Sequence, residues 1–487
     1  MNYLNRLILL LLAVLGHSEA TGQSDLFPLQ QDFIEEAREV YGTPDSLAHS
    51  SLLPFSIKSS QLQNSFFIED SAKYYSVAKA KLFRDDLISV KEPDFKLAVN
   101  PLFHFSKGFE LSDTSAYSDT INLYRNIRGF KIDGQIGKRM FFSTSFLENI
   151  VFLPSWQRAY ADSSLVIPGM GRHKDFKDSG FDYGVSNGWL SYYPAENLNL
   201  FFGHGKQFIG HGYRSHILSH QSFNYPHLKS TIILLKGKLQ VMWSLAGLQT
   251  LERKPLGEVP ESLFKRKAAT FSNISYLLGR HLELSVAEVN TWRRYDDDTG
   301  SLPLEYTAYL PVPFLGAVIK DSPGHQSRIA ANLLIKASPK LQLYAQSLIG
   351  AQSFQAGVRV NNLLLNGLRV NLEYNQSRNV QEANSLVDFT HFNENLGHPL
   401  SANFEEFISR IMYRNNRWNG SVTYTLIDAD SKRNTLNFVA GYLMNPKTNF
   451  NITLGYLNRT QNVENEYTSG VIQIGMSTSV VDTLFDF

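Results

Sequence analysis

The sequence predicts an all-β fold: a transmembrane antiparallel β-barrel of about 18 strands, preceded by a small N-terminal helical segment. Three observations predict it: an export signal, many aromatic residues in a cysteine-free chain, and apolar residues that alternate with polar ones. Phe, Tyr and Trp make up 13% of the 487 residues. Lys plus Arg (46) nearly balance Asp plus Glu (45), so nucleic acid is not expected as a partner.

Residues 1–22 have the pattern of a cleaved secretory signal peptide. Arg6 supplies the positive start, the run from Leu7 to Leu15 is entirely apolar, and Ala20 follows small and polar residues at the expected cleavage point. This apolar run is too short for a membrane-spanning helix, which takes about 20 residues. Together with the barrel pattern, the signal predicts export to the cell outer membrane.

Residues 23–92 differ from the rest and are predicted to form a small periplasmic or plugging segment. In "PLQQDFIEEAREVYG" apolar residues recur at helical spacing from Leu29 to Val40, and Gly42 stands where a helix would end. The stretch "SAKYYSVAKAKLF", residues 71–83, is a second helical candidate.

Residues 93–487 are predicted to form the barrel. In "LRVNLEYN", from Leu368 to Asn375, apolar and polar residues alternate, as in a strand with one greasy and one polar face. The same alternation recurs in "FNITLGY" and "WNGSVTYTL". The predicted strands lie near 93–108, 119–134, 138–152, 181–193, 197–205, 227–236, 238–249, 267–278, 281–291, 326–337, 340–350, 353–365, 367–378, 404–414, 418–428, 434–444, 449–460 and 467–478.

Short turns alternate with connections that are mostly much longer. Turns at Gly237 and at 445–447 are examples of the short kind. In outer-membrane barrels the periplasmic turns are short and the outer loops long, and an even strand count returns both chain ends to the periplasm. The segment 305–319 also alternates, and is assigned to an outer loop because one extra strand would reverse every later turn. Two strands more or fewer preserve parity, so 16 to 20 strands are consistent with the sequence.

The stretch "GHGKQFIGHGYRSHILSHQSFNYPHL", residues 203–228, falls in the third outer loop of this scheme and holds five of the 13 histidines. It contains no carboxylate and no His-Glu-x-x-His arrangement, so neither a metal nor another cofactor is expected. It also lacks the Gly-x-Ser-x-Gly elbow that exposes a nucleophilic serine, and no enzymatic activity is expected.

Two roles remain open for this stretch. Glycines permit close backbone approach and sharp folding back into the barrel mouth, and Phe208 would pack on the inner wall. Tyrosines and basic side chains suit sugar rings by stacking and acidic groups by charge-assisted hydrogen bonds. The glycines concerned are Gly203, Gly205, Gly210 and Gly212, and the candidate ligand-binding residues are Lys206, Tyr213, Arg214 and Tyr225.

The same stretch, read from "FFGHGK" onward, resembles the motif of the Wzi-type capsule-assembly family of outer-membrane barrels. In that family a strand ending in Gly leads to an aromatic-Gly-x-Gly turn, a Ser/Leu-rich stretch and a Pro. Together with "AHSSLLPF", residues 48–55, it resembles the Bacteroidetes branch called gliding motility protein RemB. The motif positions are Gly203, Phe208, Gly210, Gly212, Tyr213, Ser215, Leu218, Ser219 and Pro226.

The resemblance implies an 18-stranded barrel with helical elements at its periplasmic end. It also implies a role at the cell surface, either in retaining capsule polysaccharide or in gliding motility. The partners expected from it are outer-membrane lipid, and surface polysaccharide or proteins of the gliding machinery. The alternatives are a general diffusion porin and a soluble exported β-protein or hydrolase.

Overall fold

The computed structural model describes residues 24–26, 29–58, 76–254, 263–319, 324–378, 386–462 and 466–478. The predicted signal peptide, residues 1–22, lies outside the described residues. Among the helices of the described residues, none is long and apolar enough to cross a membrane.

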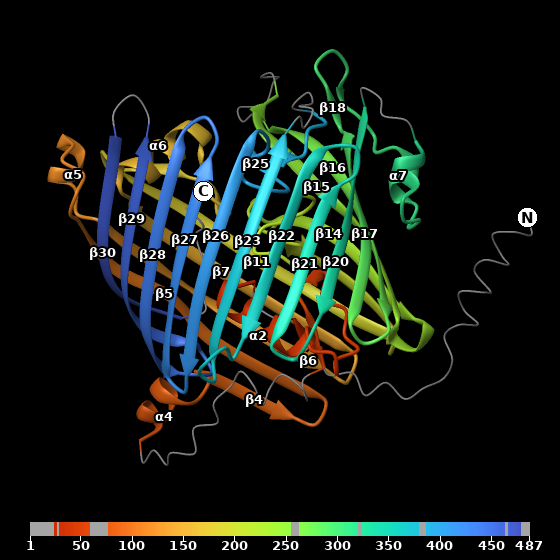
Figure 1. Ribbon diagram of the computed structural model, residues 1–487, viewed down its shortest axis with the longest axis horizontal. Helices are drawn as coiled ribbons and strands as arrows, with labels where there is room; N and C mark the ends of the chain where they lie inside the picture. Colours follow the sequence, from red (N-terminus) through yellow and green to blue (C-terminus); the bar gives the residue numbers. More distant parts are fainter. Residues whose placement is uncertain are drawn as a thin grey trace, which may run out of the picture.

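A closed antiparallel barrel dominates the molecule (Figure 1). Its sheet has 20 strands, of which β4 and β10 pair on one side only, so the other 18 form the ring. The ring closes where β30 pairs with β5, from Val471 opposite Glu110 to Ser477 opposite His104. Its strands are β5 (Phe95–Glu110), β6 (Tyr124–Ile136), β7 (Met140–Phe152), β11 (Gly180–Ala195), β12 (Leu198–Gly205), β14 (Tyr225–Leu234), β15 (Leu239–Arg253), β16 (Phe264–Leu278), β17 (Leu282–Arg293), β20 (His325–Lys336), β21 (Leu341–Leu348), β22 (Gln352–Asn361), β23 (Leu368–Arg378), β26 (Phe404–Asn415), β27 (Trp418–Asp428), β28 (Lys432–Asn445), β29 (Phe450–Asn462) and β30 (Glu466–Ser477).

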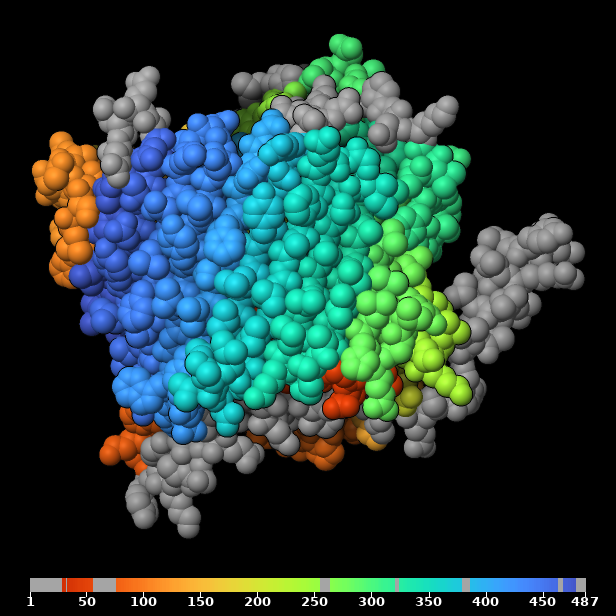
Figure 2. Space-filling view, in the orientation of Figure 1, coloured from red at the N-terminus to blue at the C-terminus, as the bar shows by residue number. Residues whose placement is uncertain are grey.

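The alternation of the sequence sets the two faces of the wall, as predicted. In β23, Leu372 points outward and is 37% exposed, whereas Asn371 and Glu373 point inward and are buried. Across the β6–β7 pair, Phe130 and Phe146 are register partners and both are exposed on the outer surface. Figure 2 shows the outer wall as a continuous surface. An apolar outer band around a polar interior is what a barrel in lipid requires.

The connections divide by length between the two ends of the barrel. Short turns such as 137–139 join strands at one end, which corresponds to the periplasmic end in barrels of this kind. Longer loops, including 153–179 and 206–224, lie at the other, outer end. The segment 305–319 adds no strand to the ring and contains η2 (Tyr306–Tyr309) and α7 (Leu315–Val318), so its assignment to an outer loop is confirmed.

Both helices predicted near the N-terminus are present, although residues 71–75 of the second candidate, 71–83, lie outside the described residues. The helix α2 (Gln31–Tyr41) ends at Gly42 and lies inside the barrel near its periplasmic end, whereas α4 (Val77–Phe83) lies at the rim (Figure 1). The remaining short elements are β1 (Ser24–Leu26), β2 (Leu52–Leu53), β3 (Ser56–Lys58), β4 (Ile88–Glu92), α5 (Ala116–Thr120), α6 (Ser155–Ser164), β8 (Val166–Ile167), β9 (Gly171–Arg172), β10 (Lys174–Phe176), β13 (Phe208–Ile209), η1 (Leu235–Gly237), β18 (Tyr295–Asp296), β19 (Gly300–Ser301), β24 (Thr390–His391) and β25 (Glu394–Asn395).

Candidate functional site

The acidic face of α2 is bound to arginines of the barrel wall. Burial by itself would raise the pKa of Glu35, but the neighbouring Arg359, Arg38 and Arg410 outweigh it and lower this pKa to about 2. Because a broken buried pair leaves an uncompensated charge, such pairs hold the helix in place. The pairs and their N···O distances are Glu35 with Arg359 of β22 (2.7 Å), Glu36 with Arg414 of β26 (2.8 Å) and Glu39 with Arg369 of β23 (2.6 Å).

The apolar face of α2 packs on a small two-stranded sheet inside the lumen. In this sheet Leu53 of β2 is the register partner of Phe208 of β13, and both side chains belong to one buried cluster with α2. Nearby, the backbone N–H and the hydroxyl of Ser50 donate to the Glu283 carboxylate of β17 at 3.0 and 2.8 Å. The two stretches that carry the family resemblance are therefore joined to each other inside the barrel.

The loop 206–224 turns into the lumen because its glycines approach the wall closely. Gly210 has φ +143°, and a Cβ there would lie 3.0 Å from Nε2 of Gln346 in β21. A Cβ on Gly212 would lie 2.3 Å from Oε1 of Gln355 in β22. Gly203 and Gly205 end β12, where the chain leaves the wall.

One serine of this loop closes a turn within it, and another joins it to a second outer loop. The Ser215 hydroxyl donates to the Ile209 carbonyl at 2.6 Å, and the Ser219 backbone N–H donates to the Leu396 carbonyl at 2.6 Å. Leu396 belongs to the outer loop 386–402, which thereby contacts the plug formed by 29–55 and 206–224. Pro226 is exposed at the start of β14, where the chain rejoins the wall.

Tyr213 and Arg214 are held by carboxylates of the wall. Their backbone N–H groups donate to Glu373 at 2.6 and 3.0 Å, and the Arg214 guanidinium donates to Glu406 at 3.0 Å. Tyr225 is likewise buried. These three residues, predicted to bind a ligand, are therefore not exposed. Carboxylates of the wall hold Tyr213 and Arg214, and Tyr225 of β14 packs in a buried apolar cluster. Tyr213 does border the cavity described below.

Lys206, the fourth residue predicted to bind a ligand, lies beneath the outer loops. Its ammonium donates to the Gly169 carbonyl at 2.7 Å, and the Glu394 carboxylate accepts the Gly169 N–H at 2.6 Å. Burial lowers the pKa of Lys206 to about 8 and raises that of Glu394 to about 8. One glycine thus links three outer loops across the mouth of the barrel.

The histidines of 203–228 have separate partners. His216 Nδ1 lies 2.7 Å from the Ser353 hydroxyl, and His220 lies 2.9 Å from the Gln31 amide. Burial lowers the pKa of each of these two imidazoles to about 3, so they are neutral at neutral pH. Within the described part of the chain, no three His, Cys, Asp or Glu side chains are grouped to hold a metal.

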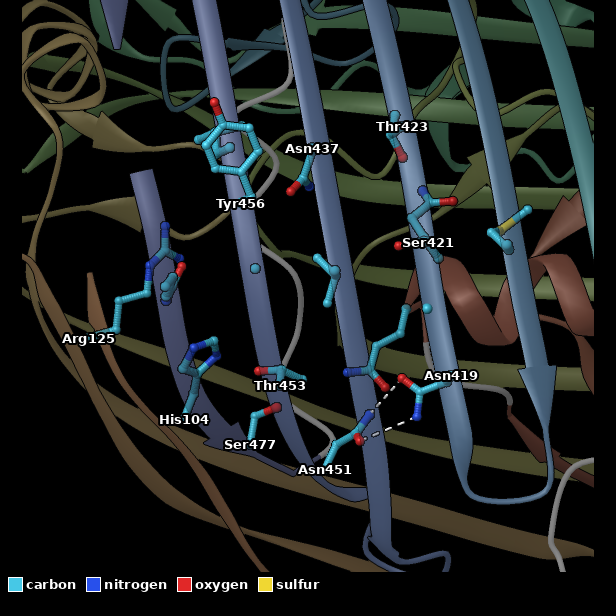
Figure 3. A pocket seen from close by; sticks show the side chains of 18 of the residues that line it. His104, Arg125, Asn419, Ser421, Thr423, Asn437, Asn451, Thr453, Tyr456 and Ser477 are labelled. Atoms are coloured by element: carbon cyan, nitrogen blue, oxygen red, sulfur yellow. Dashed lines mark hydrogen bonds between the residues drawn. The ribbon is translucent and has the colours of Figure 1, made fainter. Parts of the chain in front are cut away.

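The plug leaves one side of the lumen open. A cavity of about 400 Å³ lies between α2 and the wall formed by β5, β6 and β26 to β30. It extends from Asn449, in the periplasmic turn between β28 and β29, to Gln157 of α6 at the outer end. Figure 3 shows polar side chains of this wall directed into it, with Asn419 and Asn451 joined by reciprocal amide hydrogen bonds of 3.3 and 3.2 Å.

Polar and apolar residues contribute about equally to the cavity lining, and its charged residues are mostly basic. Among the described residues that line it, the only acidic side chain is Glu36. The arginines that line it are Arg125, Arg369, Arg410 and Arg414, and the neutral polar residues include Asn419, Ser421, Thr423, Asn437, Asn451 and Thr453.

Of these cavity residues, the sequence pointed only to Tyr213. The others occupy ordinary inward positions of alternating strands, and alternation does not distinguish an open lumen from a filled one. The sequence did contain one signal of an open lumen. The inward face of β27 carries amides and hydroxyls at Asn419, Ser421 and Thr423. The inward face of β23 carries charged side chains instead, at Arg369 and Glu373.

No protein-family model and no curated protein matches the chain. Among solved structures, it is similar to Wzi, an outer membrane protein involved in group 1 capsule assembly in Escherichia coli and described as a carbohydrate-binding β-barrel. The TM-score is 0.55 at 12% identity, over 94% of this chain and 100% of Wzi. It also aligns with Acinetobacter baumannii OccAB4 (TM-score 0.45, 9% identity, 80% of this chain and 98% of that one). For Salmonella typhi OmpF the values are 0.39, 10%, 80% and 99%.

The likeness to Wzi, at this identity, concerns the fold. The chain is an outer-membrane type of β-barrel, with 18 strands in its ring and a plug within it. Its fold is similar to that of Wzi along nearly its whole length.

Proposed function

We propose that this protein is a plugged outer-membrane barrel that associates with polysaccharide at the cell surface and has no enzymatic activity. The observation that carries the proposal is the half-filled lumen in a barrel similar in fold to Wzi. The remaining cavity offers amides, hydroxyls and tyrosines, which hydrogen-bond to sugars and stack on them. Outer-membrane lipid and a surface glycan are the proposed partners, and export through a cleaved signal peptide is part of the proposal.

A contribution to gliding motility is the second part of the proposal. It is supported by the resemblance of 48–55 and 203–228 to the RemB branch of Bacteroidetes, since both stretches belong to the plug. Proteins of the gliding machinery would then be further partners.

The test is deletion of the gene, scored together for polysaccharide retained on the cells and for spreading on a surface. We expect one or both to fall and to be restored by the full chain. A complementing chain with Arg359→Ala, which removes a wall partner of α2, should restore less at equal amounts of folded barrel. Unchanged retention and spreading in the deletion strain would contradict the proposal.

A general diffusion porin is the second candidate. The observation that favours it is the length of the cavity, from the periplasmic turn at Asn449 to Gln157 beneath the outer loops. Conductance in planar bilayers separates the two candidates, because a general porin forms a large, steady, open channel.

A further inference from the structure

Opposite α2, the described lining residues on β27, β28 and β29 carry no charged side chain. Asn419, Asn437 and Asn451, on β27, β28 and β29, present amides to the lumen (Figure 3). Each amide offers both a donor and an acceptor, as sugar hydroxyls require. A wall of this kind binds polar groups without fixing the sign of their charge.

Two arginines flank this wall on opposite sides. Arg125 projects from β6 on one side, and Arg410 from β26 on the other. Glu36, the carboxylate in the lining, already lies 2.8 Å from Arg414 and 3.8 Å from Arg369. A lumen with low-dielectric walls concentrates such a field on whatever enters it.

The charges of the plug do not cancel this excess. The surrounding carboxylates Glu35, Glu36 and Glu39 face a larger number of guanidinium groups, both on α2 and on the wall. These guanidinium groups belong to Arg38, Arg359, Arg369, Arg410 and Arg414. The net charge around the cavity therefore stays positive when the ion pairs that hold α2 are included. The cavity consequently favours an anion.

A buried acceptor lies beside the outer end of the same cavity. Gln157 of α6 lines it and is only 4% exposed. Within the described residues its Oε1 has no hydrogen-bond partner. A buried amide oxygen normally has a donor, so an unsatisfied acceptor lies next to this end of the cavity.

Aromatic rings complete the lining. Tyr124 and Tyr456 border the cavity from the wall, and Tyr213 borders it from the plug. The Arg410 guanidinium lies 4.5 Å from the centre of the Tyr213 ring. The volume of about 400 Å³ falls in the range of roughly 300–1,000 Å³ typical of small-molecule sites.

We propose that this cavity binds an acidic saccharide, an oligosaccharide that carries uronic-acid carboxylates. Arg125 and Arg410 bind the carboxylates, the asparagines of the wall bind hydroxyls, and Tyr456 contacts the face of a sugar ring. The inference rests on the proposed function, in which the partner is a glycan, and adds both the chemical class of the glycan and the place where it binds.

The experiment is calorimetric titration of the purified full chain in detergent with tetragalacturonate, and in parallel with neutral maltotetraose. Arg125→Gln should weaken binding of the acidic tetramer about tenfold or more, because it removes a hydrogen bond between charged groups. Arg125→Lys, which keeps the charge, should retain most of the preference for the acid.

Arg128→Gln is the matched control. Arg128 lies on the same strand but is on the outer face, 3.5 Å from Glu148, with both side chains more than half exposed (59% and 60%). Its substitution should leave the affinity unchanged. Heat-modifiable migration on a gel reports that each variant contains the folded barrel.

The outcomes separate this inference from the proposed function. Equal affinity for the neutral and acidic tetramers, or equal effects of Arg125→Gln and Arg128→Gln in folded protein, would overturn the acidic-saccharide site. Absence of binding by either tetramer would overturn it as well. In each case the deletion phenotype still decides independently whether the protein associates with surface polysaccharide.

Discussion

Gly210 is the residue at which the plug loop turns toward the wall. Its φ is +143°, and a Cβ at this position would lie only 3.0 Å from the Gln346 amide, so a side chain there is strained and displaces a wall contact. Gly210→Ala should therefore lower the free energy of unfolding by about 1–3 kcal/mol, measured by urea titration of the barrel in detergent. Gly205→Ala is the control, since its nearest neighbour would lie 3.5 Å away. Equal effects of the two substitutions would contradict the account of the turn.

Glu394 should make the packing of the outer loops sensitive to pH. Burial raises its pKa from 4.5 to about 8, so the folded loop holds the carboxyl proton more tightly than the unfolded loop. This stabilisation is fully present below pH 4.5 and is lost as the pH rises toward about 8. The protection of the amides around Gly169, which is the exchange rate corrected for the intrinsic pH dependence of amide exchange, should therefore fall over this range.

Glu394→Gln provides the control for that prediction. The amide stays neutral at every pH, so the variant should lose most of this pH dependence between about pH 5 and 8. An identical pH profile in the variant would show that another group governs the outer loops.

At the scale of elements, α2 is held by charge. Glu35 is fully buried among three guanidinium groups, and Glu35→Gln leaves Arg359 without its carboxylate partner at 2.7 Å. Breaking a buried pair in this way costs about 3–5 kcal/mol. We expect faster hydrogen exchange in α2, with the strands of the wall unaffected.

Glu196→Gln is the comparison for α2, because Glu196 is exposed in the turn between β11 and β12. Glu196→Gln should leave the rate of hydrogen exchange in α2 unchanged from the wild type. If both variants behave alike, the charge pairs do not hold the helix.

The sequence predicted the positions of strands and helices better than the contacts between them. The alternation of Leu368 to Asn375 placed β23 and its two faces correctly, since both depend on neighbours in the chain. Helical spacing and Gly42 likewise located α2. That α2 lies inside the lumen depends on Glu35 meeting Arg359, 324 positions away, and no local pattern encodes such a pair.

The candidate ligand residues show the same limit. Tyr213 and Arg214 were singled out as a basic and aromatic surface, but the carboxylates that bind them, Glu373 and Glu406, are 160 and 192 positions away. Both carboxylates sit on strands whose polar faces looked alike from the sequence. The cavity likewise follows from which part of the lumen the plug fills, a property of the closed barrel.

At the scale of the whole molecule, closure of the ring predicts how the protein behaves in detergent. Pairing of β30 with β5 leaves no open edge in the barrel, and an apolar outer band needs lipid or detergent around it. We expect extraction only with detergent, and faster migration on a gel before boiling than after. Extraction into buffer alone would contradict a barrel that spans a membrane.

The half-filled lumen is the central feature of the molecule, because both the proposed function and the saccharide site depend on it. The measurement that tests it most directly is the conductance of the purified full chain in a planar bilayer. A lumen occupied by 29–55 and 206–224 predicts small or no steady current, and preference for anions in any current that passes the arginine-lined cavity. A large, steady and unselective open channel would contradict the account.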